Sequence, residues 1–182
     1  MENQTHYRPT TIKVDLDAIR LNVRNLKKHL KQDVQIIAVV KANAYGHGDI
    51  QVAKAAIEAG ASMLAVATPD GAVHIREHLP TIGILVLGAS PISFAPYAAA
   101  HNISLTVFSA EWIDQLQQLN MNNQLKLHIK VDSGMGRIGV TDEQQLLSIY
   151  DKIQQQKQVV VEGIFTHFAT ADELETAYYE RQ

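Results

Sequence analysis

A short apolar run followed by a helical pattern recurs six times along this chain of 182 residues. Each unit takes about 20–30 residues, a spacing that suits parallel strands joined by right-handed helical crossovers. The first run is continuous and rich in β-branched residues, which is typical of a strand covered on both faces. The six runs cover residues 36–40, 63–67, 82–87, 103–107, 125–131 and 159–165.

Helix-capping signals follow most of these runs. An N-cap side chain accepts a hydrogen bond from a free backbone N–H of the first helical turn. The sequence predicts N-caps at Thr68, Ser109 and Thr141, and Thr141 is paired with Gln144 in a capping box. Residues 11–14 also look extended. The expected helices cover about 15–30, 49–59 (closed by Gly60), 92–100 and 109–119, with others beginning at Pro69, after Thr141 and near Asp172.

Two architectures fit six strand–helix units: an open doubly wound sheet and a TIM-type (β/α)8 barrel. A complete barrel takes about 250 residues, so six units would form an incomplete one. The length, with 46% apolar and 19% charged residues, suits one globular α/β domain.

The composition excludes several classes of function. The chain has no Cys, which excludes disulfides, thiolate metal sites and cysteine nucleophiles. A net charge of −3 argues against a nucleic-acid partner. No apolar run approaches the about 20 residues of a membrane span, and residues 1–6 carry no basic or apolar leader. We therefore expect a cytoplasmic protein with no membrane partner.

Polar side chains gather after three of the expected strands. In both architectures, ligands bind at the carboxyl ends of the strands. The segments there carry Lys41, Tyr45, Lys130, Arg137 and His167. We expect these side chains to meet at one rim of the sheet.

Lys41 directly follows the first apolar run. A lysine at a strand end is commonly solvated, but an amine shielded from water there can form a Schiff base with a carbonyl compound. His167 has the alternative role of a core histidine bonded to the backbone. Asp132 and Asp172 have the alternative roles of turn caps or counter-charges. The residues alone leave these alternatives open.

Two motifs resemble binding signatures without their usual context. Residues 134–139 spell G-x-G-x-x-G, but they follow the fifth strand and do not open a helix directly. We interpret them as a flexible loop that carries Arg137 into the site, where a guanidinium suits a carboxylate or phenolate oxygen. Residues 74–78 spell H-x-x-E-H, a zinc motif in some enzymes. On a short outer helix this pattern favours a solvated face, and no metal ligand is predicted.

Three segments resemble signatures of the alanine racemase family. Residues 38–48 (AVVKANAYGHG) resemble its pyridoxal-phosphate lysine signature, and residues 130–139 and 163–172 resemble a second and a third signature. The resemblance covers essentially the whole chain but only about the N-terminal half of a family member. It implies a TIM-type (β/α) barrel, incomplete here with about six of eight units. Residues 1–182 would be its N-terminal, cofactor-binding part, without the rest of the barrel and the C-terminal β-domain.

The resemblance also implies roles for individual residues. Lys41 would hold pyridoxal 5'-phosphate as a Schiff base and act as one catalytic base. Tyr45 would contact the cofactor phosphate, and Arg137 would contact both the cofactor's phenolic oxygen and the substrate carboxylate. His167 would pack beside the pyridine ring. Lys130 matches a lysine that is carbamylated in many members.

The implied activity is the interconversion of L- and D-alanine by two-base proton transfer, which supplies D-alanine for cell-wall peptidoglycan. In the family, the second base is a tyrosine of the partner subunit's C-terminal β-domain, so we expect a homodimer and expect the 182-residue chain to be inactive alone. The alternatives are a related barrel racemase or decarboxylase and a non-catalytic cofactor carrier. The long lysine signature and the Gly-Met-Gly-Arg loop favour the alanine enzyme.

Overall fold

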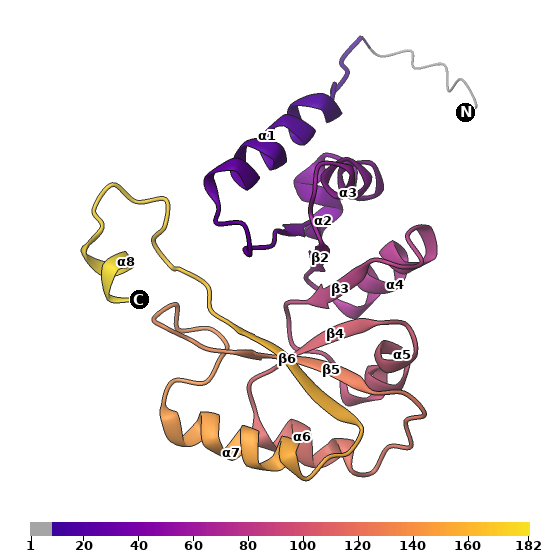
Figure 1. Ribbon diagram of the computed structural model, residues 1–182, viewed down its shortest axis with the longest axis vertical. Helices are drawn as coiled ribbons and strands as arrows, with labels where there is room; N and C mark the ends of the chain where they lie inside the picture. The colour runs from indigo at the N-terminus through magenta and orange to yellow at the C-terminus, as the bar shows by residue number, and fades with distance from the viewer. Residues whose placement is uncertain (1–8) are drawn as a thin grey trace.

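A six-stranded parallel sheet forms the centre of the computed structural model, which describes residues 9–182 (Figure 1). The strands lie side by side in sequence order, and each neighbouring pair is parallel: β1 (Ile37–Val39), β2 (Met63–Val66), β3 (Gly83–Val86), β4 (Ile103–Val107), β5 (Leu125–Lys130) and β6 (Val159–Phe165). A doubly wound sheet would reverse its strand order at a switch point, whereas a barrel keeps the sequence order. The expected incomplete α/β barrel is therefore confirmed.

Most of the helices lie on the outer side of this curved sheet, whereas the last helix lies apart from them, beyond the end of the last strand (Figure 1). Residues 1–8, which include the segment predicted to lack a leader, lie outside the described part. Within residues 9–182, no helix combines the length and apolarity that a membrane crossing requires. The elements are α1 Leu16–His29, β1 Ile37–Val39, α2 Lys41–Gly46, α3 Asp49–Glu58, β2 Met63–Val66, α4 Pro69–His78, β3 Gly83–Val86, η1 Ile92–Phe94, α5 Ala95–Ala100, β4 Ile103–Val107, α6 Ala110–Leu116, β5 Leu125–Lys130, α7 Glu143–Gln154, β6 Val159–Phe165 and α8 Ala177–Arg181.

The core lies between the outer face of the sheet and the helices. Side chains of a strand alternate between its two faces. In β5, Leu125, Leu127 and Ile129 are buried in this core, whereas His128 and Lys130 line a cavity on the inner face. The inner face of β5 therefore carries the polar groups.

Most of the predicted caps form. The Thr68 hydroxyl accepts the N–H of Gly71 at 3.3 Å, and Pro69 is the first residue of α4. The capping box of α7 is shifted by one residue from the prediction. Asp142, not Thr141, is the N-cap and accepts the N–H of Gln145 at 2.9 Å. Both Thr and Asp favour N-caps, and the carboxylate gives the charge-assisted bond.

Five other predictions are corrected. Residues 11–14 form no strand, and Ile12 is 86% exposed, because the sheet begins at β1. The last helix begins at Ala177 rather than near Asp172, since turns occupy the intervening residues. The segment predicted as helix 92–100 divides into η1 and α5, and the helix predicted to reach residue 119 ends at Leu116. Strand β1 is covered on one face only, because Ile37 and Val39 are each 40% exposed.

Candidate active site

Lys41 opens a left-handed turn that joins β1 to α3. The four residues 42–45 have φ between 51° and 55°, and none of them is glycine. Each such residue costs about 1–2 kcal/mol relative to right-handed backbone. The N–H of Ala44 donates to the carbonyl of Val40 at 3.0 Å, and the Ala44 side chain is buried in the core. Strain of this kind collects at functional sites, where the surrounding structure holds it.

The left-handed turn directs two polar side chains to the same place. The Lys41 Nζ lies 5.9 Å from the centre of the Tyr45 ring. Lys41 is half-buried at the strand end, whereas Tyr45 is 61% exposed. An amine and a phenol therefore stand together at the carboxyl end of β1.

Asp132 organises the loop that carries Arg137. Its carboxylate accepts the N–H groups of Gly134 and Gly136, each at 3.0 Å, and that of Arg137 at 2.8 Å. These bonds lower the pKa of Asp132 to about 2, and the bond from Gly134 has the largest effect. Of its two predicted roles, Asp132 therefore has that of a turn cap. The loop, which we predicted to be flexible, is instead held by hydrogen bonds to this carboxylate.

Within residues 134–139, Gly139 is required by a close contact between two segments of the backbone. Gly139 has φ of +139°, and a Cβ there would collide with the backbone of Val131 and Asp132. The glycine serves this close approach of two chain segments. The structure thus agrees with the interpretation of the segment as a loop that presents Arg137.

Lys130 is the last residue of β5 and is only 4% exposed. Its Nζ donates to the carbonyl of Val131 at 3.0 Å and lies 5.2 Å from the centre of the Phe165 ring. Burial lowers the pKa of Lys130, and the charge of Arg137 lowers it further, while Asp132 acts in the opposite direction. The site therefore favours an uncharged amine at Lys130 more than water does.

One cavity of about 420 Å³ joins these elements. Its size and its mainly apolar walls are typical of a small-molecule site. Leu85, Leu87, Ile164 and Phe165 are among its apolar lining residues. All five predicted site residues also line it, namely Lys41, Tyr45, Lys130, Arg137 and His167.

A polar network that the sequence analysis did not predict lies beside this cavity. Glu162 accepts the hydroxyl of Ser104 at 2.6 Å and lies 3.2 Å from His128 Nε2 and 3.0 Å from Lys126 Nζ. Burial opposes the ionisation of Glu162, but these bonds hold its pKa below its ordinary value. His128 also lines the candidate cavity, so the network forms part of its wall.

Gly163 allows His128 to take this position. The register of β5 and β6 shifts between Leu127 and His128, which places Gly163 opposite His128. A Cβ on Gly163 would lie 2.9 Å from two atoms of the imidazole ring. The alternation of Lys126, His128 and Lys130 in the sequence is the one local signal that could have indicated a polar inner face.

The family model described as "Alanine racemase, N-terminal domain" matches residues 14–182. The alanine racemase of Geobacillus stearothermophilus is 50% identical over 177 residues, which cover 97% of this chain and 46% of that protein. The crystal structure of alanine racemase from Bacillus anthracis, with bound L-Ala-P, is similar with a TM-score of 0.91 at 46% identity, over 97% of this chain and 46% of that one.

A histidine racemase from Leuconostoc mesenteroides subsp. sake is also similar, with a TM-score of 0.83 at 31% identity, over 91% of this chain and 45% of that one. The chain thus spans about half the length of the relatives it matches. The matched range contains both site loops, from Lys41 to Tyr45 and from Lys130 to Arg137, as well as His167. By the family model and by these identities, the chain belongs to the alanine racemase family.

Proposed function

We propose that this protein is a pyridoxal-5'-phosphate-dependent racemase that interconverts L- and D-alanine. The observation that supports this most directly is the cavity lined by Lys41, Tyr45, Lys130, Arg137 and His167. The membership of the chain in the alanine racemase family supports the same activity. In this proposal, residues 1–182 are the N-terminal part of the cofactor-binding barrel.

The donor set around the cavity fits this cofactor. Lys41 supplies an amine for covalent attachment of an aldehyde, and the exposed Tyr45 hydroxyl can donate to a phosphate. Arg137 can donate to a phenolate oxygen and to the substrate carboxylate, since its guanidinium carries several donors in one plane. His167 would pack beside the aromatic ring. When bound, pyridoxal phosphate withdraws electrons from the substrate Cα and acidifies its C–H bond.

Lys41 is the residue that we expect to move the proton. Its amine stands at the cavity wall on the side of β1, so it can remove or return a proton on one face of the substrate Cα only. Racemisation needs a second base on the opposite face. Tyr45 lies on the same loop as Lys41. Tyr45 therefore does not supply it. As the resemblance to the alanine racemase family implies, we propose that a tyrosine of the partner subunit's C-terminal β-domain, in a homodimer, supplies the second base.

Lys130 and Arg137 are proposed to act together. The lowered pKa of Lys130 favours the neutral amine, which can bond to carbon dioxide with release of one proton. The resulting carbamate would be an anion close to the cationic Arg137 and would orient it by a charge-assisted bond. Mass spectrometry of the intact protein under bicarbonate should then detect one added carbon dioxide, which Lys130→Ala would abolish.

The cellular setting follows from the proposed reaction. D-Alanine is the product that cell-wall peptidoglycan requires, and we propose that the enzyme supplies it from the cytoplasm. Since we propose that the second base belongs to a C-terminal β-domain that residues 1–182 do not include, we expect the 182-residue chain alone to convert L- to D-alanine at a trace rate or not at all.

Cofactor attachment provides the test. Adding pyridoxal phosphate should produce a visible absorbance band, and borohydride reduction should fix the cofactor on the peptide that contains Lys41. Lys41→Ala should abolish both signals, whereas Lys54→Ala, on the exposed side of α3, should leave them unchanged. An unchanged band and unchanged labelling in Lys41→Ala would overturn the site assignment.

A second candidate substrate is favoured by one observation. The similar structure from Leuconostoc mesenteroides is a histidine racemase, so this barrel is not restricted to alanine enzymes. Racemisation assays with alanine and histidine, at equal concentration, distinguish the two. Cofactor binding with no turnover of any amino acid by the assembled protein would favour the carrier alternative.

A further inference from the structure

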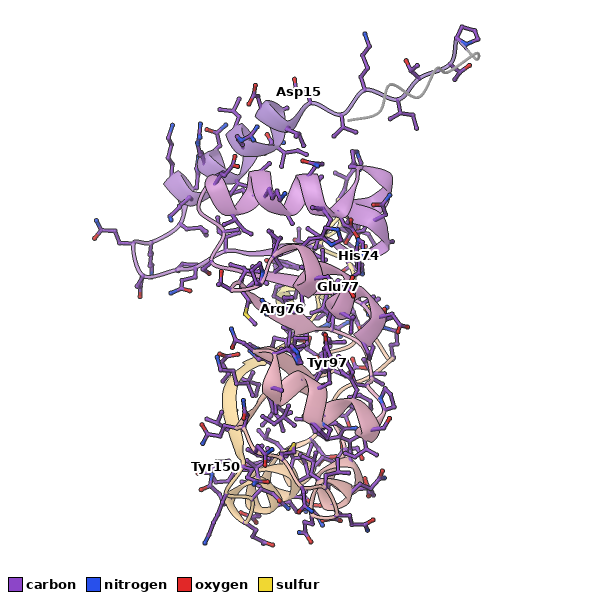
Figure 2. All side chains as sticks on the ribbon, turned by 90° about the vertical axis from the view of Figure 1, so that its right-hand side faces the viewer. Asp15, His74, Arg76, Glu77, Tyr97 and Tyr150 are labelled. Atoms are coloured by element: carbon purple, nitrogen blue, oxygen red, sulfur yellow. The ribbon has the colours of Figure 1, made fainter. Side chains whose placement is uncertain are left out.

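The end of helix α4 brings three metal-ligating side chains together outside the candidate active site. One ligand atom from each of His74, Glu77 and His78 lies within 4.8 Å of the other two, and all three side chains are exposed. Figure 2, which faces α4, shows His74 and Glu77 beside each other on the outside of the helix layer. The sequence pattern alone favours a solvated face here, but on this geometry we propose that these three residues form a binding site for a divalent transition-metal ion of the zinc class.

His78 has the hydrogen bond that a metal-binding histidine needs. Its Nδ1 lies 2.9 Å from the carbonyl oxygen of His74. A carbonyl oxygen only accepts, so Nδ1 carries the proton and Nε2 keeps its lone pair. Histidines that bind metals usually donate their other ring N–H in this way, which fixes the tautomer and the ring orientation. His78 is thus preset to bind a metal through Nε2.

Two other helices of the described chain end in the same way and serve as internal comparisons. His29 Nδ1 lies 2.8 Å from the carbonyl of Asn25, and His101 Nδ1 lies 2.9 Å from that of Tyr97. In both helices the residue one turn earlier is not a histidine. In α4 that residue is His74, whose ring centre lies 4.9 Å from that of His78.

Asp49 ties the cluster to a second helix. Its Oδ1 lies 3.5 Å from His74 Nε2, and Asp49 is the first residue of α3. Carboxylates commonly bond to the metal-binding histidine or enter the ligand set themselves. Asp49 can therefore orient His74 or add a ligand, and in either case it adds negative charge.

The ligand set selects the kind of ion. Two imidazoles and a carboxylate suit zinc, copper or nickel, whereas magnesium prefers oxygen ligands alone. Around tetrahedral zinc, neighbouring ligand atoms lie about 3.4 Å apart, so the three side chains must close in when the ion binds. Exposed side chains change rotamer readily, because few neighbours hold them. Three protein ligands leave the remaining position to water or to Asp49.

Zinc titration of the protein tests the proposal, with the ion alone as the probe and magnesium as the comparison. We expect the α4 site to bind one zinc ion and expect His74→Ala or His78→Ala to weaken this binding by about tenfold or more. His101→Ala is the matched control and should leave the affinity unchanged. Zinc should also raise the melting temperature of the unaltered protein and of His101→Ala, but not that of His78→Ala.

Glu77→Gln keeps the helix and removes the charged ligand, so it should weaken zinc binding even if a histidine variant folds poorly. Equal zinc affinity in His78→Ala, His101→Ala and the unaltered protein would overturn the proposal, as would equal affinity for zinc and magnesium. Neither readout uses pyridoxal phosphate, so the metal site and the proposed racemase activity can fail independently.

Discussion

The left-handed turn after β1 predicts an unusual effect for Ala42→Gly. Ala42 has φ of 52° and ψ of 49°, and its side chain is exposed. Removing the Cβ should relieve about 1–2 kcal/mol of steric strain. Glycine loses more backbone freedom on folding, which costs about 0.5–1 kcal/mol. The balance is a stabilisation of about 0.5–1 kcal/mol, which corresponds to a rise in melting temperature of about 1–4 °C for a chain of this size.

The same substitution should weaken the proposed cofactor site. A glycine at this position gives the free turn more conformations, so fixing Lys41 against the cofactor costs more. We expect the affinity for pyridoxal phosphate to fall by about two- to fivefold, measured from the absorbance band. Stability and binding would then change in opposite directions, as they do where strain serves a site.

Ala18→Gly is the matched control. Ala18 is also exposed, but it lies in the right-handed helix α1, where glycine destabilises by about 0.5–1 kcal/mol. Calorimetry of both variants should therefore give melting temperatures that shift in opposite directions. A fall in melting temperature for Ala42→Gly equal to that for Ala18→Gly would refute the strain argument.

Three other substitutions test the supports of the fold and the site, and a fourth, Gly71→Ala, is the control for Gly163→Ala. Asp132 has a folded pKa of about 2, below its ordinary value of 3.8, so its contribution to stability is complete above that ordinary pKa and is lost as the pH falls towards 2. Urea unfolding across this range should show a weaker pH dependence in Asp132→Asn. Gly163→Ala should cost about 1–3 kcal/mol in chemical unfolding, because the new Cβ meets the ring of His128. Gly71→Ala, where a Cβ has ordinary contacts in a helix, should instead stabilise by up to about 1 kcal/mol. Arg76→Ala should cost about 2–4 kcal/mol in the same assay, because three backbone carbonyls lose a buried donor.

Local signals predicted the parts of the fold that depend on neighbouring residues. Thr68 and Pro69 start α4 because their bonding and backbone preferences act within one turn. The parallel pairing of the strands follows from the length of each crossover, whereas their order does not, since the same units also suit a doubly wound sheet. The capping box at α7 shows the limit of such signals, since Thr141 and Asp142 were both suitable caps and differed only in strength.

The conformations that shape the candidate site depend on contacts between distant segments. No glycine marks residues 42–45 as left-handed, so their backbone could not be inferred from composition. The buried Ala44 and its bond to Val40 hold this turn against its own preference. The network at Glu162 likewise depends on a shift in register between β5 and β6, which joins residues from separate strands.

The two loops of the candidate site share one physical arrangement. Lys41 is only half-buried and Arg137 is exposed, so packing alone does not fix either side chain. Their backbones are fixed instead, by the left-handed turn in one loop and by the carboxylate of Asp132 in the other. Substitutions at Ala42 and Asp132 should therefore alter cofactor binding although neither side chain lines the cavity. Substitutions at Lys41 and Arg137 should abolish or weaken binding with little effect on stability. This contrast separates residues that position the site from those that would perform its chemistry.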